Sequence, residues 1–237
     1  MAASRPPRAP CNRRVLRCTS EGTARPSAVP APVIAVLDYG IGNLRSAEKA
    51  LQHLGAEAEL IDDPERAATA DGVVLPGVGA FGRCAQALRM SGLDGAARFA
   101  IGRGVPFLGI CVGFQLLYEG SDEDPSASGL GILPGTVRRL PDGVKHPQMQ
   151  WNVVEIADGC DSGLLGGVPD PAWVYFVHSY APERTDDTTS TCEYGGAITA
   201  SAERGALWGT QFHPEKSGAV GLGILANFVR RVDEACA

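Results

Sequence analysis

The chain has 237 residues, 44% of them hydrophobic, which is enough to bury the core of one large domain or two small ones. Its formal net charge is −6, but residues 1–32 hold six of the 21 Lys and Arg and one of the 27 Asp and Glu, so the remainder is strongly acidic. An acidic body argues against nucleic acid as the main partner. No apolar run reaches the ~18 residues of a transmembrane helix, so no membrane association is expected.

The seven cysteines are scattered, without a CxxC pair and without a Cys/His cluster at zinc spacing. This pattern is typical of free thiols in a reducing compartment. We therefore expect a cytoplasmic protein with no metal and no cofactor.

Residues 1–32 are rich in Arg, Pro, Ala and Ser and contain six prolines. They lack the continuous apolar stretch of a secretory signal. An organellar transit peptide would also be rich in Arg, but this number of prolines is more typical of a disordered extension. A start codon assigned too far upstream would explain the segment equally well. In either case we expect the fold to occupy residues 33–237.

From Val33 onward, apolar runs alternate with helical patterns. Val33–Asp38 is a predicted strand, residues 39–43 are a turn, and Asn43 is positioned to cap a helix that Gly55 ends. The pattern then predicts strands at Ala58–Ile61 and Gly72–Leu75, helical sequence over 80–103, a buried strand at Val105–Ile110 and a helix at Val112–Glu119. This βαβαβ order predicts a mostly parallel sheet with helices on both faces.

The second half of the chain is richer in strands. The pattern predicts them at Thr136–Leu140, Asn152–Ile156, Trp173–His178, Ala197–Ala202 and Ala206–Phe212, with residues 203–205 as a hairpin loop between the last two. A final helix is predicted over Val220–Val232. The whole indicates one α/β domain with a mixed sheet.

The most informative motif is Gly109-Ile110-Cys111-Val112-Gly113, between the buried strand and the helix that follows it. A nucleophile flanked by glycines at a strand–helix turn is a nucleophile elbow. The turn places the sulfur at a helix N-terminus, where free N–H groups favour the thiolate. An isolated Cys is more often a buried structural residue. The glycines and the strand–helix context favour a nucleophile.

A thiolate nucleophile needs a base and a group that orients the base. His213 and Glu215 in the sequence QFHPE are two residues apart, so on extended backbone both side chains point to the same face. The order Cys, His, Glu is that of hydrolases with an elbow. Taken alone, His213 could be an ordinary surface residue, and His178, which ends an apolar strand, could be a core residue.

A glycine-rich loop, Leu75-Pro-Gly-Val-Gly-Ala-Phe81, follows an inner strand. Gly77, Gly79 and Gly82 formally match the GxGxxG fingerprint, but no acidic residue lies ~20 positions downstream to hold a ribose. We expect instead that backbone N–H groups of this loop stabilise an oxyanion. Without Cys111 nearby, an ordinary βα turn would be the better interpretation.

Together these motifs resemble the class I glutamine amidotransferases over roughly residues 33–235, which implies a flavodoxin-like α/β fold. DYGIGN at 38–43, PGVGAF at 76–81, Trp151-Asn152, YFVHSY at 175–180 and FHPEKS at 212–217 are more specifically similar to the glutaminase subunits of imidazole glycerol phosphate synthases.

The resemblance implies roles for particular residues. Cys111 would attack the side-chain amide of glutamine, His213 would shuttle the proton, and Glu215 would orient the imidazole. The N–H groups of Val78 and Val112 would bind the oxyanion. The substrate would be held by Glu123, Ser179 and Tyr180, and the pocket around it would also contain Gly77, Gly79 and Gln115. Glu123 could otherwise be a solvated loop acid.

The resemblance also implies a partner. In the family, ammonia passes to a cyclase subunit with a (β/α)8 barrel, which forms imidazole glycerol phosphate and an aminoimidazole carboxamide ribotide in histidine biosynthesis. Asn43, Ser46, Trp151 and Lys216 match positions near the docking face. The family's usual His-Met-Gly is Gln148-Met149-Gln150 here, a departure that leaves the catalytic interpretation intact and bears on docking.

Three alternatives are distinguishable. The chain could supply ammonia to another synthase, such as those of the chorismate branch, although DYGIGN and the Lys-Ser after Glu215 argue against this. It could be a stand-alone Cys hydrolase of the same fold, which would release ammonia without a partner. A catalytically inactive scaffold would not require the intact Cys, His and Glu.

Overall fold

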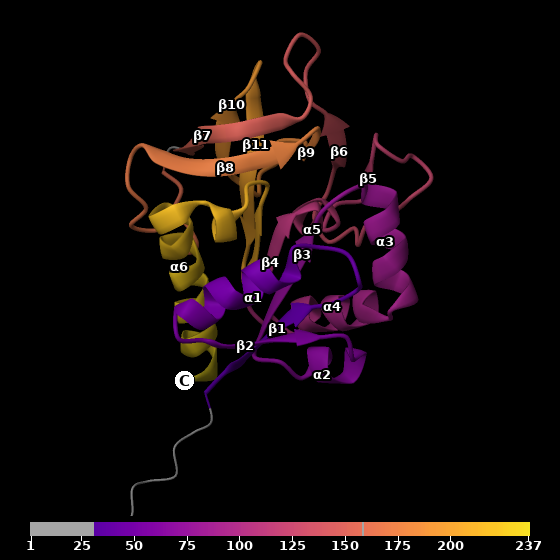
Figure 1. Ribbon diagram of the computed structural model, residues 1–237, viewed down its shortest axis with the longest axis vertical. Helices are drawn as coiled ribbons and strands as arrows, with labels where there is room; N and C mark the ends of the chain where they lie inside the picture. The colour runs from indigo at the N-terminus through magenta and orange to yellow at the C-terminus, as the bar shows by residue number, and fades with distance from the viewer. Residues whose placement is uncertain (1–30, 158) are drawn as a thin grey trace, which may run out of the picture. The chain divides into compact units, whose positions relative to one another are not determined.

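The computed structural model describes residues 31–157 and 159–237, so the predicted extension 1–32 lies almost entirely outside the described residues (Figure 1). The helices are α1 Leu44–His53, α2 Pro64–Ala68, α3 Phe81–Met90, α4 Leu93–Gly102, α5 Val112–Gln115, the 3-10 helix η1 Pro214–Lys216 and α6 Gly218–Cys236.

The strands are β1 Val33–Leu37, β2 Glu57–Ile61, β3 Gly72–Gly77, β4 Phe107–Cys111, β5 Gly120–Ser121, β6 Thr136–Arg139, β7 Gln148–Ile156, β8 Ala172–His178, β9 Tyr180–Pro182, β10 Thr188–Glu193, β11 Ala197–Arg204 and β12 Leu207–Thr210.

Within the described chain, one sheet of nine strands runs in the order β2-β1-β3-β4-β12-β11-β10-β7-β8. The first five strands of this order are parallel, and the last four pair antiparallel. Every residue of β3, β4 and β12 is buried. Strands that are covered on both faces have continuous apolar sequences, which explains runs such as Phe107–Ile110. The predicted α/β fold with a mixed sheet is therefore confirmed, although parallel and antiparallel pairings are equally frequent in it.

Helices cover the parallel half of this sheet in two groups (Figure 1). Helix α1 packs against α6, whereas α4 packs against α2 and α3. Helix α1 buries Leu44, Ala47 and Leu51, which recur at helical spacing. The antiparallel strands form the upper part of Figure 1, where β7 and β8 cross above the ends of the parallel strands. A small second sheet, β5-β6-β9, lies beside them.

The structure differs from the sequence-based expectations at several elements. The helical sequence over 80–103 is two helices, because Gly92 adopts φ 75° between them. The helix predicted over 112–119 ends at Gln115. Asn43 occupies the N-cap position of α1, but among the described residues its side chain accepts a hydrogen bond from the Ser46 hydroxyl (2.8 Å) and not from a backbone N–H. Helix α6 is longer than predicted, at Gly218–Cys236.

Five elements were not predicted, namely α2, β5, β9, β10 and η1. Helix α2 has Asp63 as its N-cap, which accepts from the N–H of Glu65 (2.8 Å) and of Arg66 (3.3 Å), and Pro64 occupies the first turn. Strand β10 consists mainly of Ser and Thr. No helix in the described ranges is long and apolar enough to cross a bilayer.

Candidate active site

Cys111 ends strand β4 and begins the turn into α5. Its φ of 56° and ψ of −112° make it the one non-glycine residue with positive φ among those described. Such a conformation costs of order 1–3 kcal/mol and persists only where the surroundings enforce it. Glycines allow the close packing around it, since a Cβ on Gly113 would lie 1.8 Å from the carbonyl oxygen of Leu75. The strained turn presents the sulfur beyond the end of the sheet.

His213 follows β12, the neighbour of β4, and is only 2% exposed. Its Nδ1 lies 2.8 Å from Oε1 of Glu215, which lies in the first turn of η1. Ser217 fixes the same segment, because its hydroxyl donates to the His213 carbonyl (2.6 Å) and accepts from the N–H of Tyr175 (3.0 Å). The backbone therefore places the imidazole between Glu215 and the cavity that contains Cys111.

The charge of His213 depends on its two partners. Burial lowers the pKa of the imidazole, but the neighbouring Cys111 and Glu215 outweigh burial and raise the pKa from 6.5 to about 10. Nε2, the nitrogen that does not face Glu215, is buried and has no hydrogen-bond partner within the described part of the chain. A protonated His213 thus has one N–H available for a sulfur or a bound substrate.

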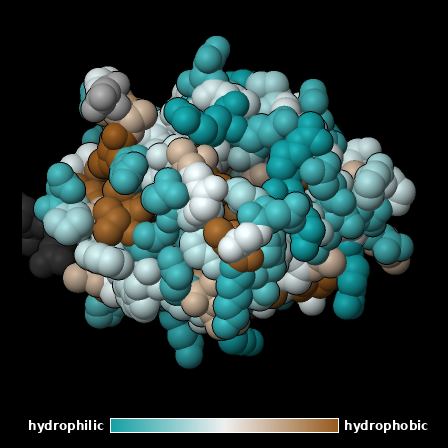
Figure 2. All heavy atoms as spheres, turned by 90° about the horizontal axis from the view of Figure 1, so that it is seen from above, coloured by the Kyte–Doolittle hydropathy of each residue, from teal (hydrophilic) through white to brown (hydrophobic). Residues whose placement is uncertain are grey.

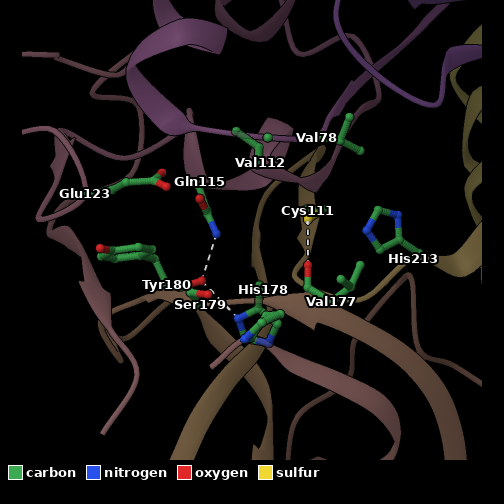
Figure 3. Close-up of a pocket in the computed structure, with 12 residues that line it drawn as sticks. Val78, Cys111, Val112, Gln115, Glu123, Val177, His178, Ser179, Tyr180 and His213 are labelled. Atoms are coloured by element: carbon green, nitrogen blue, oxygen red, sulfur yellow. Dashed lines mark hydrogen bonds between the residues drawn. The ribbon is translucent and has the colours of Figure 1, made fainter. Parts of the chain in front are cut away.

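A pocket of about 250 Å³ opens beside Cys111 and His213 (Figure 3). It is lined by Val78, Gly79, Cys111, Val112, Gln115, Glu123, Pro147, Val177, His178, Ser179, Tyr180 and His213. The structure therefore brings together nine of the residues predicted for catalysis or substrate binding. Gly77 and Glu215 do not line the pocket: Gly77 precedes Val78 at the end of β3, and Glu215 contacts Nδ1 of His213.

The loop Gly77–Gly79 is held tightly against the elbow. The hydroxyl of Tyr39 donates to the Pro76 carbonyl (2.7 Å), and the thiol of Cys84 donates to the Val78 carbonyl (3.3 Å). A Cβ on Gly77 would lie 2.6 Å from the Gly113 nitrogen, so only glycine fits. Val78 and Val112 consequently lie on the same wall of the pocket, above Cys111 in Figure 3.

The opposite wall contains the predicted substrate residues. The side-chain nitrogen of Gln115 donates to the Tyr180 carbonyl (2.8 Å), and Ser179 lies beside Tyr180. Glu123 is at the mouth, where its Oε2 accepts from the N–H of Phe81 (2.7 Å) at the start of α3. A carboxylate at the mouth and carbonyls along one wall suit the ammonium group of an amino acid.

Sequence reasoning did not identify four residues of this site, namely Pro147, Val177, His178 and Gln211. Gln211 is fully buried, and its Nε2 lies 3.7 Å from the sulfur of Cys111. Burial is the main cause that lowers the pKa of His178 to about 4, so this imidazole is neutral at physiological pH. Its Nδ1 donates to the Tyr180 carbonyl (2.9 Å). Gln211 and His178 could have been noticed from their place in recognisable motifs, because Gln211 begins QFHPE and His178 lies within YFVHSY.

The four residues predicted for partner docking lie along adjoining elements. Asn43 and Ser46 are at the start of α1, which contacts η1, where Lys216 is exposed. Helix η1 in turn contacts β8, which pairs with β7 and its half-exposed Trp151. Seen from above, this end of the molecule is mostly hydrophilic, with hydrophobic side chains gathered towards the left of the view (Figure 2).

The described ranges contain no group of three or more His, Cys, Asp or Glu side chains arranged to hold a metal ion. The groups that the pocket presents for chemistry are a thiol, an imidazole with a carboxylate behind it, and backbone N–H groups.

The sequence of the chain matches a known protein family. Residues 35–232 match the family model described as glutamine amidotransferase class-I. Imidazole glycerol phosphate synthase subunit HisH of Moorella thermoacetica is 48% identical over 204 residues, covering 85% of this chain and 96% of that protein. Its counterpart of the same name from Methanothermobacter thermautotrophicus is 46% identical over 201 residues, covering 83% and 98%.

Solved structures share the fold at lower identity. PurLQS of Thermotoga maritima aligns with a TM-score of 0.66 and 21% identity, covering 85% of this chain and 99% of that one. A glutamine amidotransferase of Thermotoga maritima aligns with a TM-score of 0.61 and 16% identity, covering 86% and 99%.

Proposed function

Because the chain belongs to the class-I glutamine amidotransferase family, we propose that it is the glutaminase subunit of an imidazole glycerol phosphate synthase. In this role it hydrolyses glutamine to glutamate and ammonia. The relatives named HisH cover nearly the same length, which supports this subfamily over the other amidotransferases.

The observation that carries the proposal is the strained Cys111 in one pocket with His213. Strain at a non-glycine residue is characteristic of functional sites, because folding alone gains nothing from it. The sulfur lies at the N-terminus of a helix, and Glu215 orients an imidazole on the other side of the pocket. A nucleophile, a base and a group that orients the base are the requirements of covalent acyl transfer.

The first half of the reaction transfers the acyl group. The Cys111 thiolate attacks the side-chain amide carbon of glutamine, and the carbonyl π electrons move to oxygen, where the N–H groups of Val78 and Val112 stabilise the negative charge. The tetrahedral intermediate then collapses. Its C–N bond breaks, Nε2 of His213 gives its proton to the departing nitrogen, and ammonia and a glutamyl thioester result.

The second half regenerates the thiolate. Water attacks the thioester carbon while the now neutral His213 accepts one of its protons. Collapse of this intermediate breaks the C–S bond, with the electron pair returning to Cys111, and releases glutamate. Glu215 remains a carboxylate throughout and stabilises the imidazolium, which is present before the first half-reaction and forms again in the second.

Ammonia then passes to a cyclase subunit with a (β/α)8 barrel, which forms imidazole glycerol phosphate and an aminoimidazole carboxamide ribotide. The docking face comprises Asn43, Ser46, Trp151 and Lys216. Support comes from the exposed side chains of β7, where Met149 and Trp151 are 61% and 49% exposed. Large apolar side chains that alternate along one strand face solvent at a cost unless a partner covers them.

Reconstitution tests the proposal. The chain is purified with the cyclase encoded by the same organism, and formation of imidazole glycerol phosphate is measured with glutamine as the nitrogen source. We expect product only when both subunits are present. Glutamine hydrolysis that is equally fast without the cyclase, together with no product in its presence, would favour a stand-alone hydrolase.

A further inference from the structure

Gln211 is a buried side chain that the reaction described above does not use. It follows β12, two residues before His213, and its backbone N–H donates to the Ala200 carbonyl (2.8 Å). None of its surface is exposed to solvent. Its side-chain nitrogen lies 3.7 Å from the sulfur of Cys111, and its oxygen accepts from the side-chain nitrogen of Gln115 (3.0 Å).

The hydrogen bonds around Gln211 determine which end of its amide faces the sulfur. The Tyr180 carbonyl can only accept, so the end of Gln115 that lies 2.8 Å from it must be the NH2 group. That NH2 group also contacts Gln211, which must therefore present its oxygen to Gln115. The remaining end of the Gln211 amide is a donor, and it points at Cys111.

We propose that Gln211 is a dedicated hydrogen-bond donor to the Cys111 thiolate, held in its donating orientation by Gln115 and the Tyr180 carbonyl. This inference rests on the proposed role of Cys111 as nucleophile. Gln115 then has two roles: it lines the substrate pocket, and its side-chain NH2 group fixes the orientation of the Gln211 amide.

The chemistry of the sulfur explains why such a donor is useful. As a thiol, Cys111 donates to the Val177 carbonyl, although at 4.0 Å this contact is long. A thiolate has no proton to donate, so that carbonyl no longer stabilises it, whereas a fixed N–H does. Hydrogen bonds to charged groups are stronger than those between neutral groups. Gln211 thus favours the anion before attack and again when hydrolysis of the thioester expels it.

The test measures the thiolate directly. The full chain, without glutamine or partner, is treated with iodoacetamide over a range of pH, and alkylation of Cys111 is quantified by mass spectrometry of its peptide. Exposed Cys236 in the same sample provides the internal reference. In Gln211→Met, which keeps the length and loses the amide, we expect half-maximal alkylation at a pH about one unit higher, equivalent to about tenfold less thiolate below that pH.

Two further variants separate donation from packing. Gln148→Met is the matched control, because Gln148 is also fully buried and its Nε2 also faces a cysteine sulfur, that of Cys192, at 3.8 Å. We expect it to leave the Cys111 profile unchanged. Gln211→Glu preserves the shape and replaces the donor with a carboxyl group, so its shift should exceed that of Gln211→Met.

The outcomes distinguish the inference from the proposed function. A native pH profile in folded Gln211→Met and Gln211→Glu would overturn the role of Gln211 while leaving Cys111 as a reactive thiol. If Cys111 of the native chain were alkylated no faster than Cys236, the proposed role of Cys111 as nucleophile would be wrong, and so would the inference about Gln211.

Discussion

The imidazole of His213 is buried between a carboxylate and a thiol, and these neighbours make it a stabilising cation. Its folded-state pKa of about 10 lies above the ordinary 6.5. Folding therefore favours the protonated form, and the stability that this contributes is complete below about pH 6.5 and is lost as the pH rises towards 10.

Thermal melting of the native chain and of His213→Asn between pH 6.5 and 10 tests this account of the charge. The native melting temperature should fall through this interval, and the variant should lose part of that slope because it lacks the titrating group. His53→Asn, on the exposed end of α1, is the control and should keep the native slope. Parallel curves for the native chain and His213→Asn would contradict the raised pKa.

The presence of Cys111, His213 and Glu215 in one candidate site was predictable, because their spacing in the sequence indicates this chemistry. A Gly-x-Cys-x-Gly turn and a His-x-Glu pair need only local backbone geometry to be recognised. Gln211 was not, because its role depends on Gln115 and Cys111, which are 96 and 100 residues away. Contacts at such separations exist only after β12 has paired with β4.

At the scale of elements, the site depends on how closely α5 approaches β3. The Gly113 backbone lies against the Leu75 carbonyl, where a Cβ would come within 1.8 Å. This approach brings Cys111 beside the loop Gly77–Gly79, so the proposed nucleophile and the N–H groups proposed to bind the oxyanion depend on the same packing contact.

Gly113→Ala should therefore destabilise the chain by about 3 kcal/mol or more, because neither backbone can move without displacing a buried strand. Urea denaturation measures the change. Gly223→Ala is the matched control: this glycine lies within α6 with no atom near its Cβ position, so alanine should stabilise the helix by roughly 0.5–1 kcal/mol. Equal stability of the two variants would show that the elbow is not closely packed.

Most elements of the sheet were predictable, because apolar runs and glycine turns mark its inner strands. Strand β10 was not, since Thr189 and Ser190 are buried polar residues that pair by hydrogen bonds with Ser201 on β11. Small hydroxyl side chains favour turns as readily as strands when their partners are unknown. Helix α2 was missed although Asp63 and Pro64 carry the usual signals of a helix start.

At the scale of the whole molecule, residues 1–32 are expected to be dispensable. Their composition offers too little apolar surface to offset the entropy of ordering them. A chain that begins at Pro32 should melt within a few degrees of the full chain and retain its glutaminase activity in the complex. A large loss of either would mean that the segment docks on the body or on the partner.

Docking should also control the rate of glutamine hydrolysis. One oxyanion donor contributes roughly 3–4 kcal/mol, or ~100–1000-fold in rate. The Val78 N–H belongs to the peptide that joins Gly77 to Val78, between the two carbonyls that Tyr39 and Cys84 hold, and the glycine lowers the cost of rotating this peptide towards the oxyanion. We expect the lone chain to hydrolyse glutamine slowly, and the cyclase, loaded with its nucleotide substrate, to accelerate it by favouring the inward orientation. Equal steady-state rates for the lone chain and the loaded complex would exclude this control.

The most direct test of the central claim is Cys111→Ala, assayed as the complex with the cyclase. The substitution removes the nucleophile and leaves the docking face unchanged, so the account predicts that glutamine no longer supports product formation while added ammonia supports it at the native rate. Melting temperature and co-purification with the cyclase establish that the complex is intact. If the intact variant complex lost both activities equally, or kept the glutamine-dependent one, Cys111 would not be the nucleophile of a glutaminase.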